Sequence, residues 1–292
     1  MNPNTRNGLL AGLGAYLIWG ILPLYLRMLV GIPAADVLAN RILWSLVLIA
    51  AIVIASGGIA RFSAVVRQPR LLLLLTTSAA AIAVNWLMYT WAILNGHVLD
   101  TSLGYFINPL ISILFGVVLL GERLLPAQWL AVALAFAGVA TIAIAKGALP
   151  LISLGIAFSF ALYGLIRKLA GVDSISGLLV ETLLLGPFAL GWLLTRPTGL
   201  FAHPPTISAL LIAGGALTAI PLLLFGVAAR HLPLSTLGVM QYLSPTMVFL
   251  LAILVFDEPI DPWQMIAFGC IWAGLAVYTL SQAPRGRAAT VD

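Results

Sequence analysis

The sequence predicts an all-α integral membrane protein with ten transmembrane helices, arranged as two inverted repeats of five helices each. Three observations lead to this prediction. Of the 292 residues, 62% are hydrophobic and only 8% are charged, whereas about a quarter of the residues in an ordinary soluble domain are charged. The charged residues fall mostly in short gaps between long apolar runs. The second half of the chain also repeats the layout of the first.

The apolar runs have roughly the 20-residue length that a helix needs to cross a bilayer core about 30 Å thick. The connections between them are short and leave no room for a soluble domain. The first run is too long for the core of a signal peptide and is interpreted as a retained span. The ten predicted spans are residues 8–30, 37–55, 71–94, 101–120, 126–145, 150–168, 176–195, 207–229, 235–255 and 262–281.

The distribution of Lys and Arg predicts the orientation, because loops on the cytoplasmic side of a membrane carry an excess of these residues. With the N-terminus in the cytoplasm and ten spans, both termini are cytoplasmic. The net charge of +5 is therefore interpreted as membrane topology and not as nucleic-acid binding, since no basic cluster with interleaved aromatic residues exists. Arg6, Arg61, Arg67, Arg70, Arg123, Arg167, Lys168, Arg230, Arg285 and Arg287 would face inward, and Arg27, Arg41, Lys146 and Arg196 outward.

Two passages carry the internal repeat most clearly: GYFINPLISILFGVVLLGER, from Gly104, and QYLSPTMVFLLAILVFDEP, from Gln241. Each places a Glu 13 positions after a Pro. Because five is an odd number, the second half must enter the membrane from the opposite side, and inverted repeats of this kind allow alternating access. The predicted units are residues 1–146 and 147–282, followed by a polar tail at 283–292. An offset of 136 pairs Pro109 with Pro245, Glu122 with Glu258, Gln128 with Gln264 and Gly138 with Gly274.

The repeated glutamates, Glu122 and Glu258, each end an apolar run four residues before a Pro. That Pro suits the first turn of the following helix, and a carboxylate there would meet the positive end of that helix dipole. Proton coupling is the alternative role. Acids that relay protons usually lie deeper in the membrane, so structure of the turn is the favoured interpretation.

Two Pro residues lie inside predicted spans, in Asn108-Pro109 and Ser244-Pro245. Each Pro removes the hydrogen bond to the carbonyl four residues back, which frees the carbonyls of Tyr105 and Gln241. Lipid cannot satisfy these groups, so both helices are candidates to line a hydrated cavity. A kink that is satisfied by a neighbouring helix is the alternative.

Arg41 and Glu181 each lie about five residues inside a predicted span and are related by an offset of 140. Their depths are counted from opposite faces, so a direct salt bridge between them is not expected. Arg41 could snorkel outward, or it could line an outer vestibule and contact polar or anionic substrate groups. A carboxylate at the depth of Glu181 is costly unless it is protonated, paired or hydrated. Glu181 is therefore expected to face the interior, where it lines an inner vestibule or carries a coupling proton.

Several residues with rings or amides lie within the predicted spans, and a cavity lined by rings and a few amides suits a partly apolar, planar solute. His97, His203 and His231 lack ligand spacing, and Cys270 is the single cysteine, so neither a metal site nor a cofactor is predicted. Gly8 and Gly12 are expected to serve close helix packing. The residues predicted to bind substrate or line its pathway are Tyr16, Trp19, Arg41, Asn85, Trp86, Tyr105, Asn108, Tyr163, Glu181, Gln241 and Tyr242.

The motifs WGILPLY, NRILWS, NWLMYTWA, SLGYFINP with LGER, and STLGVMQYLSP occur in this order along nearly the whole chain. They closely resemble those of RarD-type proteins of the EamA branch of the drug/metabolite transporter superfamily. The resemblance implies ten helices in two EamA repeats, a permease of the cytoplasmic membrane, and an association with chloramphenicol. One departure is Asp257-Glu258, where the general pattern has Gly-Glu.

These observations together predict a secondary transporter, and not an enzyme, that moves a small amphipathic metabolite or drug by alternating access, with efflux as the expected direction. The alternatives are an integral-membrane enzyme or flippase acting on lipid-linked substrates, which would need a cluster of acids, His or metal ligands at one face, and a passive channel. The expected partners are a small-molecule substrate, the lipid bilayer and a coupling proton. No nucleic acid is expected, and the protein is expected as a monomer or homodimer.

Overall fold

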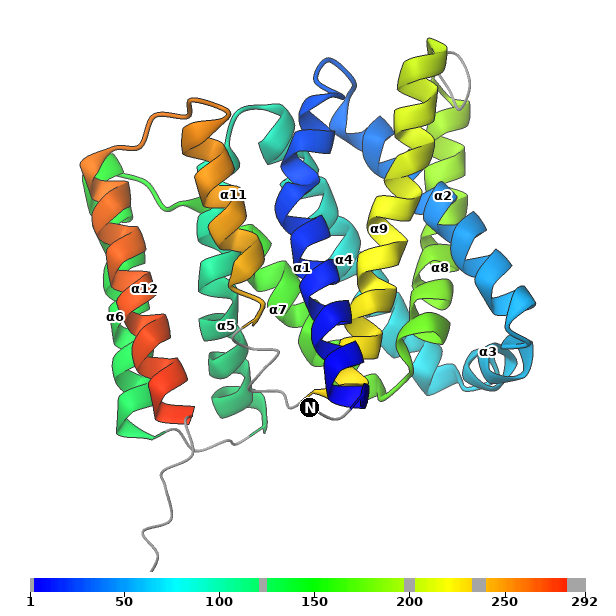
Figure 1. The fold of residues 1–292 in the computed structure, drawn as a ribbon, viewed down its shortest axis with the longest axis horizontal. Helices are drawn as coiled ribbons and strands as arrows, with labels where there is room; N and C mark the ends of the chain where they lie inside the picture. The colour runs from blue at the N-terminus through cyan, green and yellow to red at the C-terminus, as the bar shows by residue number, and fades with distance from the viewer. Residues whose placement is uncertain (1–2, 121–124, 197–202, 233–239, 283–292) are drawn as a thin grey trace, which may run out of the picture. The chain divides into compact units, whose positions relative to one another are not determined.

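The computed structural model describes residues 3–120, 125–196, 203–232 and 240–282, which form helices, turns and short connections without a strand (Figure 1). The all-helical prediction is therefore confirmed for the described residues. The helices are α1 (Pro3–Arg27), α2 (Ala34–Ala55), α3 (Ile59–Val66), α4 (Pro69–Leu94), α5 (Val98–Leu120), α6 (Pro126–Lys146), α7 (Leu151–Ala170), α8 (Ser174–Leu194), α9 (Pro205–His231), α11 (Leu243–Leu254) and α12 (Pro262–Gln282).

The ends of these helices follow local sequence signals. Pro occupies the first turn of α4, α6 and α9, where its missing N–H is not needed. Asp173 caps α8 by accepting a hydrogen bond from the Ser176 backbone N–H at 3.0 Å. Before α12, Asp261 and Gln264 each accept a hydrogen bond from the backbone N–H of the other, which is a reciprocal cap.

Eight described helices, α1, α2, α4, α5, α6, α8, α9 and α12, are long and apolar enough to cross a membrane, and α7 and α11 contribute shorter apolar segments. The connection after the second predicted span contains the short helix α3. One expectation needs correction, because α11, in the ninth predicted span, is only 12 residues long, about 18 Å at the rise of an α-helix. Residues 235–239 of the ninth predicted span lie outside the described residues, as do Glu122 and Arg123.

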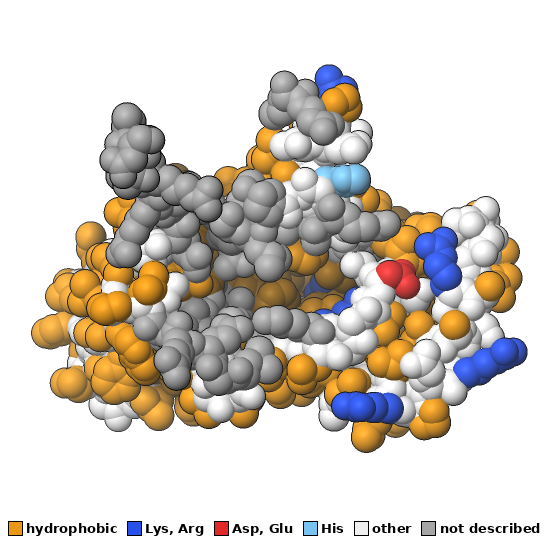
Figure 2. All heavy atoms as spheres, turned by 90° about the horizontal axis from the view of Figure 1, so that it is seen from below, with side chains coloured by type: hydrophobic (Ala, Val, Ile, Leu, Met, Phe, Trp, Pro, Cys, Tyr) orange, Lys and Arg blue, Asp and Glu red, His pale blue; other side chains and the backbone are white. Residues whose placement is uncertain are grey.

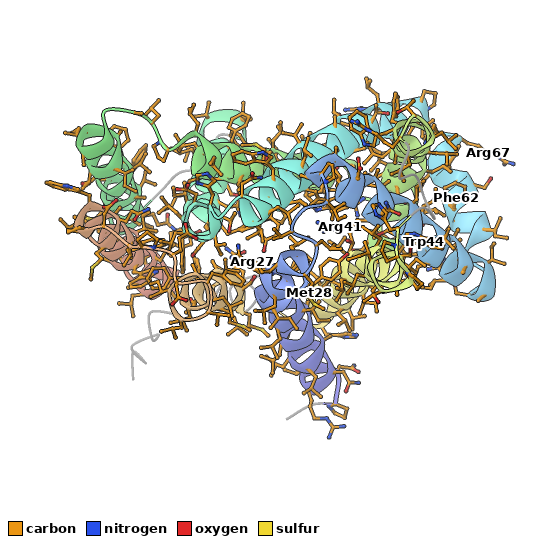
Figure 3. The ribbon with its side chains drawn as sticks, turned by 90° about the horizontal axis from the view of Figure 1, so that it is seen from above. Arg27, Met28, Arg41, Trp44, Phe62 and Arg67 are labelled. Carbon is orange, nitrogen blue, oxygen red and sulfur yellow. The ribbon has the colours of Figure 1, made fainter. Side chains whose placement is uncertain are left out.

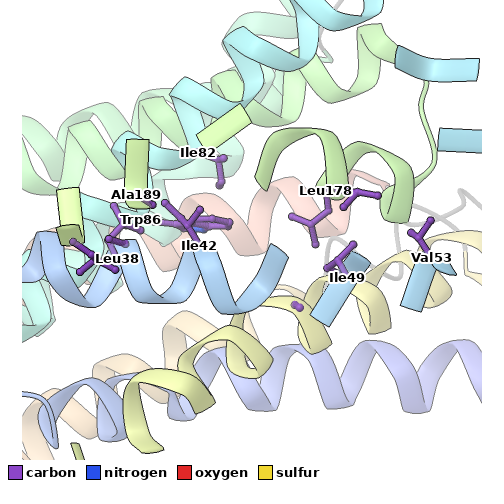
Figure 4. Close-up of a cluster of buried hydrophobic side chains, with 12 residues drawn as sticks. Leu38, Ile42, Ile49, Val53, Ile82, Trp86, Leu178 and Ala189 are labelled. Atoms are coloured by element: carbon purple, nitrogen blue, oxygen red, sulfur yellow. The ribbon is translucent and has the colours of Figure 1, made fainter. Parts of the chain in front are cut away.

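The chain divides into two compact units, residues 1–112 with 151–259 and residues 113–150 with 260–292. In the first unit, α2 and α8 are antiparallel neighbours, because Asp36 at the start of α2 accepts a hydrogen bond from Trp192 near the end of α8. An apolar core joins these two helices to α4. Figure 4 shows this core, with Leu38, Ile42, Ile49 and Val53 of α2, Ile82 and Trp86 of α4, and Leu178 and Ala189 of α8.

Helices α1 and α9 also pack closely in the first unit. A Cβ on Gly8 would lie 2.8 Å from the His231 Cβ, and one on Gly12 would contact Ala228, so the expectation of close packing at these two glycines is confirmed. At the other end of the pair, the Tyr25 hydroxyl donates a hydrogen bond to the Leu210 carbonyl at 3.0 Å. The two helices therefore run antiparallel.

In the second unit, α6 and α12 pack through the two glycines that the repeat pairs. A Cβ on Gly138 would lie 2.9 Å from the Ala267 carbonyl oxygen, and a Cβ on Gly274 would lie 2.8 Å from the Ala131 carbonyl oxygen. Ala131 and Ala267 are themselves related by the same offset of 136. The contact between the two helices is thus reciprocal, with each glycine admitting the backbone of the other helix.

The surface suits a lipid environment. Large side chains such as Phe136, Ile144 and Phe188 are 74%, 82% and 79% exposed. In Figure 2, hydrophobic side chains cover much of the described surface on the face that is shown. Exposed apolar surface of this extent is unusual for a soluble monomer and matches the hydrocarbon core of a membrane.

Candidate functional site

Arg41 of α2 is buried in the first unit, with 3% of its surface exposed. Its Nε donates a hydrogen bond to Thr218 Oγ1 of α9 at 2.9 Å, and its Nη1 donates to Thr90 Oγ1 of α4 at 3.1 Å. Figure 3 shows Arg41 among the helices, in contrast to Arg67, which points away from them. Arg41 therefore does not snorkel, and its place in an outer vestibule stays a prediction.

Aromatic side chains surround this guanidinium. Its Cζ lies 5.8 Å from the ring centroid of Trp86, within the range of a cation–π contact. The hydroxyls of Tyr25, Tyr89 and Tyr105 are near enough to interact with it electrostatically. We call the group of Arg41, Trp86, Thr90, Thr218, Tyr25 and Tyr89 the Arg41 site.

Two close approaches of the backbone bring Arg41 to α9. A Cβ on Gly214 would lie 2.9 Å from Arg41 Cγ, so a larger residue there would displace the arginine. One turn along α2, Ser45 donates a hydrogen bond to the Gly215 carbonyl at 3.0 Å. The adjacent glycines of α9 therefore allow α2 to approach near enough for Arg41 to reach Thr218.

Glu181 of α8 is 1% exposed and has a different set of partners. Ser78 of α4 donates a hydrogen bond to Glu181 Oε1 at 2.6 Å, and Arg167 Nη1 of α7 lies 3.6 Å from the same oxygen. Glu181 Oε2 is buried without a hydrogen bond within the described part of the chain. We call Glu181 and Arg167 the Glu181 pair. Both expectations for Glu181 hold, since it faces the interior and pairs with Arg167 and not with Arg41.

A series of rings leads from the Arg41 site toward the Glu181 pair. Tyr89 contacts Tyr105, Tyr105 contacts Phe160, and Phe160 contacts Tyr163, with centroids 5.7, 5.6 and 5.8 Å apart. Tyr163 in turn interacts electrostatically with Glu181 and Arg167. The structure thus connects two charged groups that the sequence could only place on equivalent helices.

An amide holds the middle of this series in place. Asn85 Oδ1 accepts a hydrogen bond from the Tyr105 hydroxyl at 3.1 Å, and Asn85 Nδ2 donates to the Ile156 carbonyl at 2.9 Å and to Ser159 Oγ at 3.1 Å. Every polar atom of this buried amide therefore has a partner, which fixes the orientation of the Tyr105 ring.

Other predicted site residues lie apart from this series. Tyr16 and Trp19 of α1 form a separate ring cluster with Phe225 of α9, and Tyr242 stacks on Phe106 at 6.4 Å between centroids. Asn108 is buried next to Pro109 inside α5, and its Oδ1 has no hydrogen bond within the described residues. The role of these residues in binding a substrate stays a prediction.

The prediction for the second proline pair is wrong. Gln241 and Tyr242 form a turn, and α11 begins at Leu243. Gln241 therefore does not lie well inside a helix, and Pro245 stands in the first turn of α11, where its missing N–H breaks no hydrogen bond. The Pro245 carbonyl accepts a hydrogen bond from Ser102 of α5 at 2.9 Å, which joins these two segments.

Glu258 has a structural role, as expected, but the helix it caps is not the expected one. Its Oε2 accepts hydrogen bonds from the backbone N–H groups of Val98 and Leu99, at 2.8 and 3.1 Å, and so caps α5 instead of the following α12. Burial raises the pKa of Glu258 above its usual range, although these two hydrogen bonds oppose the shift.

Arg167, Ser78, Thr90, Thr218 and Tyr25 are the contact residues that sequence reasoning missed. Arg167 lies at the end of an apolar run, and this position predicts a charge that faces the cytoplasm. Ser78, Thr90 and Thr218 carry no signal of their own, since Ser and Thr side chains within a helix often bond to the backbone of that same helix. A polar residue on each neighbouring helix, at a depth that matches Arg41 or Glu181, is the signal that could have found them.

The chain is similar to known membrane proteins. The EamA-like transporter family matches it twice, over residues 6–144 and 148–280. An uncharacterised transporter of Pseudomonas aeruginosa is 47% identical over 280 residues, which cover 94% of this chain and 94% of that protein. Protein RarD of Escherichia coli K12 is 41% identical over 94% of this chain and 95% of RarD. A second Pseudomonas aeruginosa protein, named chloramphenicol-sensitive protein RarD, is 33% identical over 92% of each chain.

A solved crystal structure aligns with 96% of this chain and 99% of that chain, with a TM-score of 0.64 and 21% sequence identity. A similarity at this level of identity shows a shared fold. Full-length matches to transporters and RarD proteins, two matches to one family, and a set of long apolar helices all agree. This multi-pass membrane protein therefore belongs to the RarD-type members of the EamA-like transporter family, within the drug/metabolite transporter superfamily.

Proposed function

We propose that the protein is a secondary transporter of the cytoplasmic membrane that exports a small amphipathic metabolite or drug by alternating access. Two inverted five-helix halves, residues 1–146 and 147–282, enclose the pathway, and both termini are cytoplasmic. The Arg41 site and the Glu181 pair lie along this pathway, and the series of rings between them provides a partly apolar surface for the solute.

One observation carries this proposal: the placement of the two buried charges. Arg41 and Glu181 each lie seven residues after the first residue of their helix, Ala34 of α2 and Ser174 of α8. These helices are antiparallel, since Asp36 at the start of α2 contacts Trp192 near the end of α8. An inverted repeat with a central pathway would place charged residues at equivalent positions of two helices that run in opposite directions, as observed for Arg41 and Glu181.

The relatives support the class of substrate. One of them is named a chloramphenicol-sensitive protein, which associates a member of the family with an aromatic, amphipathic drug. The rings beside Arg41 and around Tyr105 suit a planar solute of this kind. Glu181, which has one oxygen without a hydrogen bond, is the candidate to carry a coupling proton.

Thiol labelling tests alternating access without knowledge of the substrate. A single cysteine would replace Thr90 beside Arg41 in a Cys270→Ala background, and a membrane-impermeant maleimide would be added to right-side-out or to inverted vesicles. A position on an alternating pathway is expected to react from each side in turn. Labelling of this position from one side only, or from neither, would contradict the proposal.

Two exposed positions give matched controls for this experiment. Met28 just after α1 is 61% exposed and Val66 at the end of α3 is 37% exposed. Under the proposed orientation, a cysteine at Met28 reacts only from outside and a cysteine at Val66 only from inside. These variants show that the vesicles are sealed and oriented, so that two-sided labelling at Thr90 reports on the protein itself.

A further inference from the structure

The charged groups buried in the first unit are not balanced. Glu181 has Arg167 at 3.6 Å, and Asp36, which is 3% exposed, has Arg196 at 3.9 Å and a hydrogen bond from Trp192 at 2.7 Å. Arg41 is also 3% exposed, as Asp36 is. Among the residues that the structure describes, no carboxylate lies within ion-pair distance of its guanidinium.

This imbalance cannot be removed by a change in protonation. An arginine side chain in a protein does not lose its proton, and an isolated charge in an apolar interior is costly. Thr90 accepts a hydrogen bond from Nη1 and Thr218 accepts one from Nε, and both acceptors are neutral hydroxyls. These hydroxyls do not neutralise the positive charge of the guanidinium, whereas a bound anion would.

The surroundings limit what that anion can be. A single unpaired cation balances a single negative charge, which favours a carboxylate over a doubly charged phosphate. The guanidinium presents its N–H groups in a planar fork that matches the two oxygens of a carboxylate. The ring of Trp86, whose centroid lies 5.8 Å from the guanidinium carbon, provides a flat apolar surface, which suits an aromatic group attached to that carboxylate.

We propose that Arg41 is the carboxylate-binding residue of the substrate site, and that the substrate is an aromatic or otherwise planar organic monoanion. This inference rests on the proposed function and narrows its substrate class. The alternative is a purely structural role for Arg41. In that case its contacts with Thr90, Thr218 and Trp86 would hold the side chain in place, and Arg41 would bind no ligand.

The test uses three compounds of similar size and different charge: phenylacetate, phenylacetamide and phenethylamine. Binding of each to the purified full-length protein would be measured by titration calorimetry at neutral pH. Phenylacetate is expected to bind at least about tenfold more tightly than phenylacetamide, because it adds charge-assisted hydrogen bonds. Phenethylamine is expected not to bind. Equal binding of the three compounds, or no binding by any of them at millimolar concentration, would overturn the inference.

Three variants test whether Arg41 causes the preference for phenylacetate over phenylacetamide. Arg41→Gln should reduce the affinity for phenylacetate to that for phenylacetamide and leave the latter within about twofold, since only the charge-assisted bonds are lost. Arg41→Lys keeps the charge without the planar fork and should keep a weaker preference for the anion. Arg67→Ala, which removes an exposed arginine, should change nothing. A preference for phenylacetate that survives Arg41→Gln would assign anion binding to another group.

Binding of the three compounds to the wild-type protein shows whether an anion is preferred, even if neither Arg41 variant folds. The result of this binding experiment can also be distinguished from the result of the labelling experiment that tests the proposed function. Two-sided labelling at Thr90 with equal binding of the three compounds would keep the transporter and reject the anion. Binding of phenylacetate that depends on Arg41, with one-sided labelling, would keep the anion site and reject alternating access.

Discussion

The Arg41 site and the Glu181 pair occupy equivalent places on α2 and α8, yet they neutralise charge in different ways. Glu181 is matched by Arg167 at 3.6 Å and by the Ser78 hydroxyl at 2.6 Å. Arg41 has two threonine hydroxyls, at 2.9 and 3.1 Å, and the Trp86 ring. In the Glu181 pair a cation faces the buried carboxylate, whereas Arg41 has no carboxylate partner among the described residues.

This difference predicts that substitutions in the Glu181 pair and at Arg41 affect different properties of the protein. A buried pair loses free energy of folding when one partner is removed, because the remaining charge has no compensation. A buried charge that has no partner already carries this cost, so its removal should not destabilise the protein. The Glu181 pair is therefore expected to act on the stability of the fold, and the Arg41 site on ligand binding.

The largest effect is expected from Arg167→Ala. This change leaves the Glu181 carboxylate buried without a cation, and it should lower the free energy of unfolding by about 3 kcal/mol. Chemical unfolding in detergent would measure the loss. The double variant Arg167→Ala with Glu181→Gln should recover most of it, because a neutral amide needs no counter-ion. A double variant as unstable as Arg167→Ala would show that packing, and not charge, causes the loss.

Arg41→Met tests the other half of the comparison. It replaces an unmatched buried cation by an apolar side chain, and such replacements are often neutral or stabilising by about 1–4 kcal/mol. The same unfolding experiment should therefore show unchanged or increased stability, together with the loss of phenylacetate binding. A loss of several kcal/mol would mean that Arg41 holds the fold together, which would remove the contrast with Glu181.

Gly177→Ala perturbs the Glu181 pair through its geometry. A Cβ at Gly177 would overlap the Arg167 guanidinium, so Arg167 must move away from Glu181, at an expected cost of about 1–3 kcal/mol. Gly191→Ala is the matched control on the same helix, since a Cβ there meets nothing within 4 Å. It should be neutral or slightly stabilising, because alanine favours the helix. If the two variants were equally stable, the Arg167 guanidinium would not lie against Gly177, which would contradict the structure.

The smallest effect concerns Glu258, a carboxylate held by backbone N–H groups and not by an arginine. Its pKa is raised from the usual value of 4.5, so the folded state binds its proton more tightly than the unfolded state. The stability from this group is present below pH 4.5 and is lost as the pH rises through the folded pKa. Unfolding across this range should show the slope, and Glu258→Gln should flatten it while keeping an oxygen for the Val98 N–H.

Asp173 provides a control of opposite sign for this pH dependence. Burial alone would raise its pKa, but the hydrogen bonds from Ser176 hold it below the usual 3.8. Its contribution is present above pH 3.8 and is lost as the pH falls through the folded pKa. Asp173→Asn should therefore change the slope only in acid. The same change in slope for both variants would contradict the assignment of the two caps.

Much of the fold could be predicted from the sequence, because apolar runs about 20 residues long have one stable form in lipid. The repeat also indicated the paired glycines Gly138 and Gly274, which lie at the contact between α6 and α12. Asp257, which replaces the glycine of the family pattern, has a φ of 51°. The turn there keeps the left-handed conformation, which Asp tolerates better than most residues.

The contacts of the site were less predictable, for a physical reason. Periodicity gives the depth of a residue in the membrane but not which helix lies beside it. The sequence could thus indicate that Arg41 and Glu181 are buried, while Thr218, Thr90 and Arg167, their partners on other helices, had to come from the structure. The turn at Gln241 and the cap formed by Glu258 were missed because both depend on neighbours distant in sequence.

The inverted arrangement of the two halves is tested most directly by labelling the turns that precede α2 and α8. Ile32 and Val172 occupy equivalent positions, seven residues before Ala39 and Leu179, and single cysteines there would be introduced into a Cys270→Ala background. An impermeant maleimide should label Ile32→Cys only in right-side-out vesicles and Val172→Cys only in inverted ones. Labelling of both cysteines from the same side would contradict the inverted repeat and, with it, the proposed mechanism.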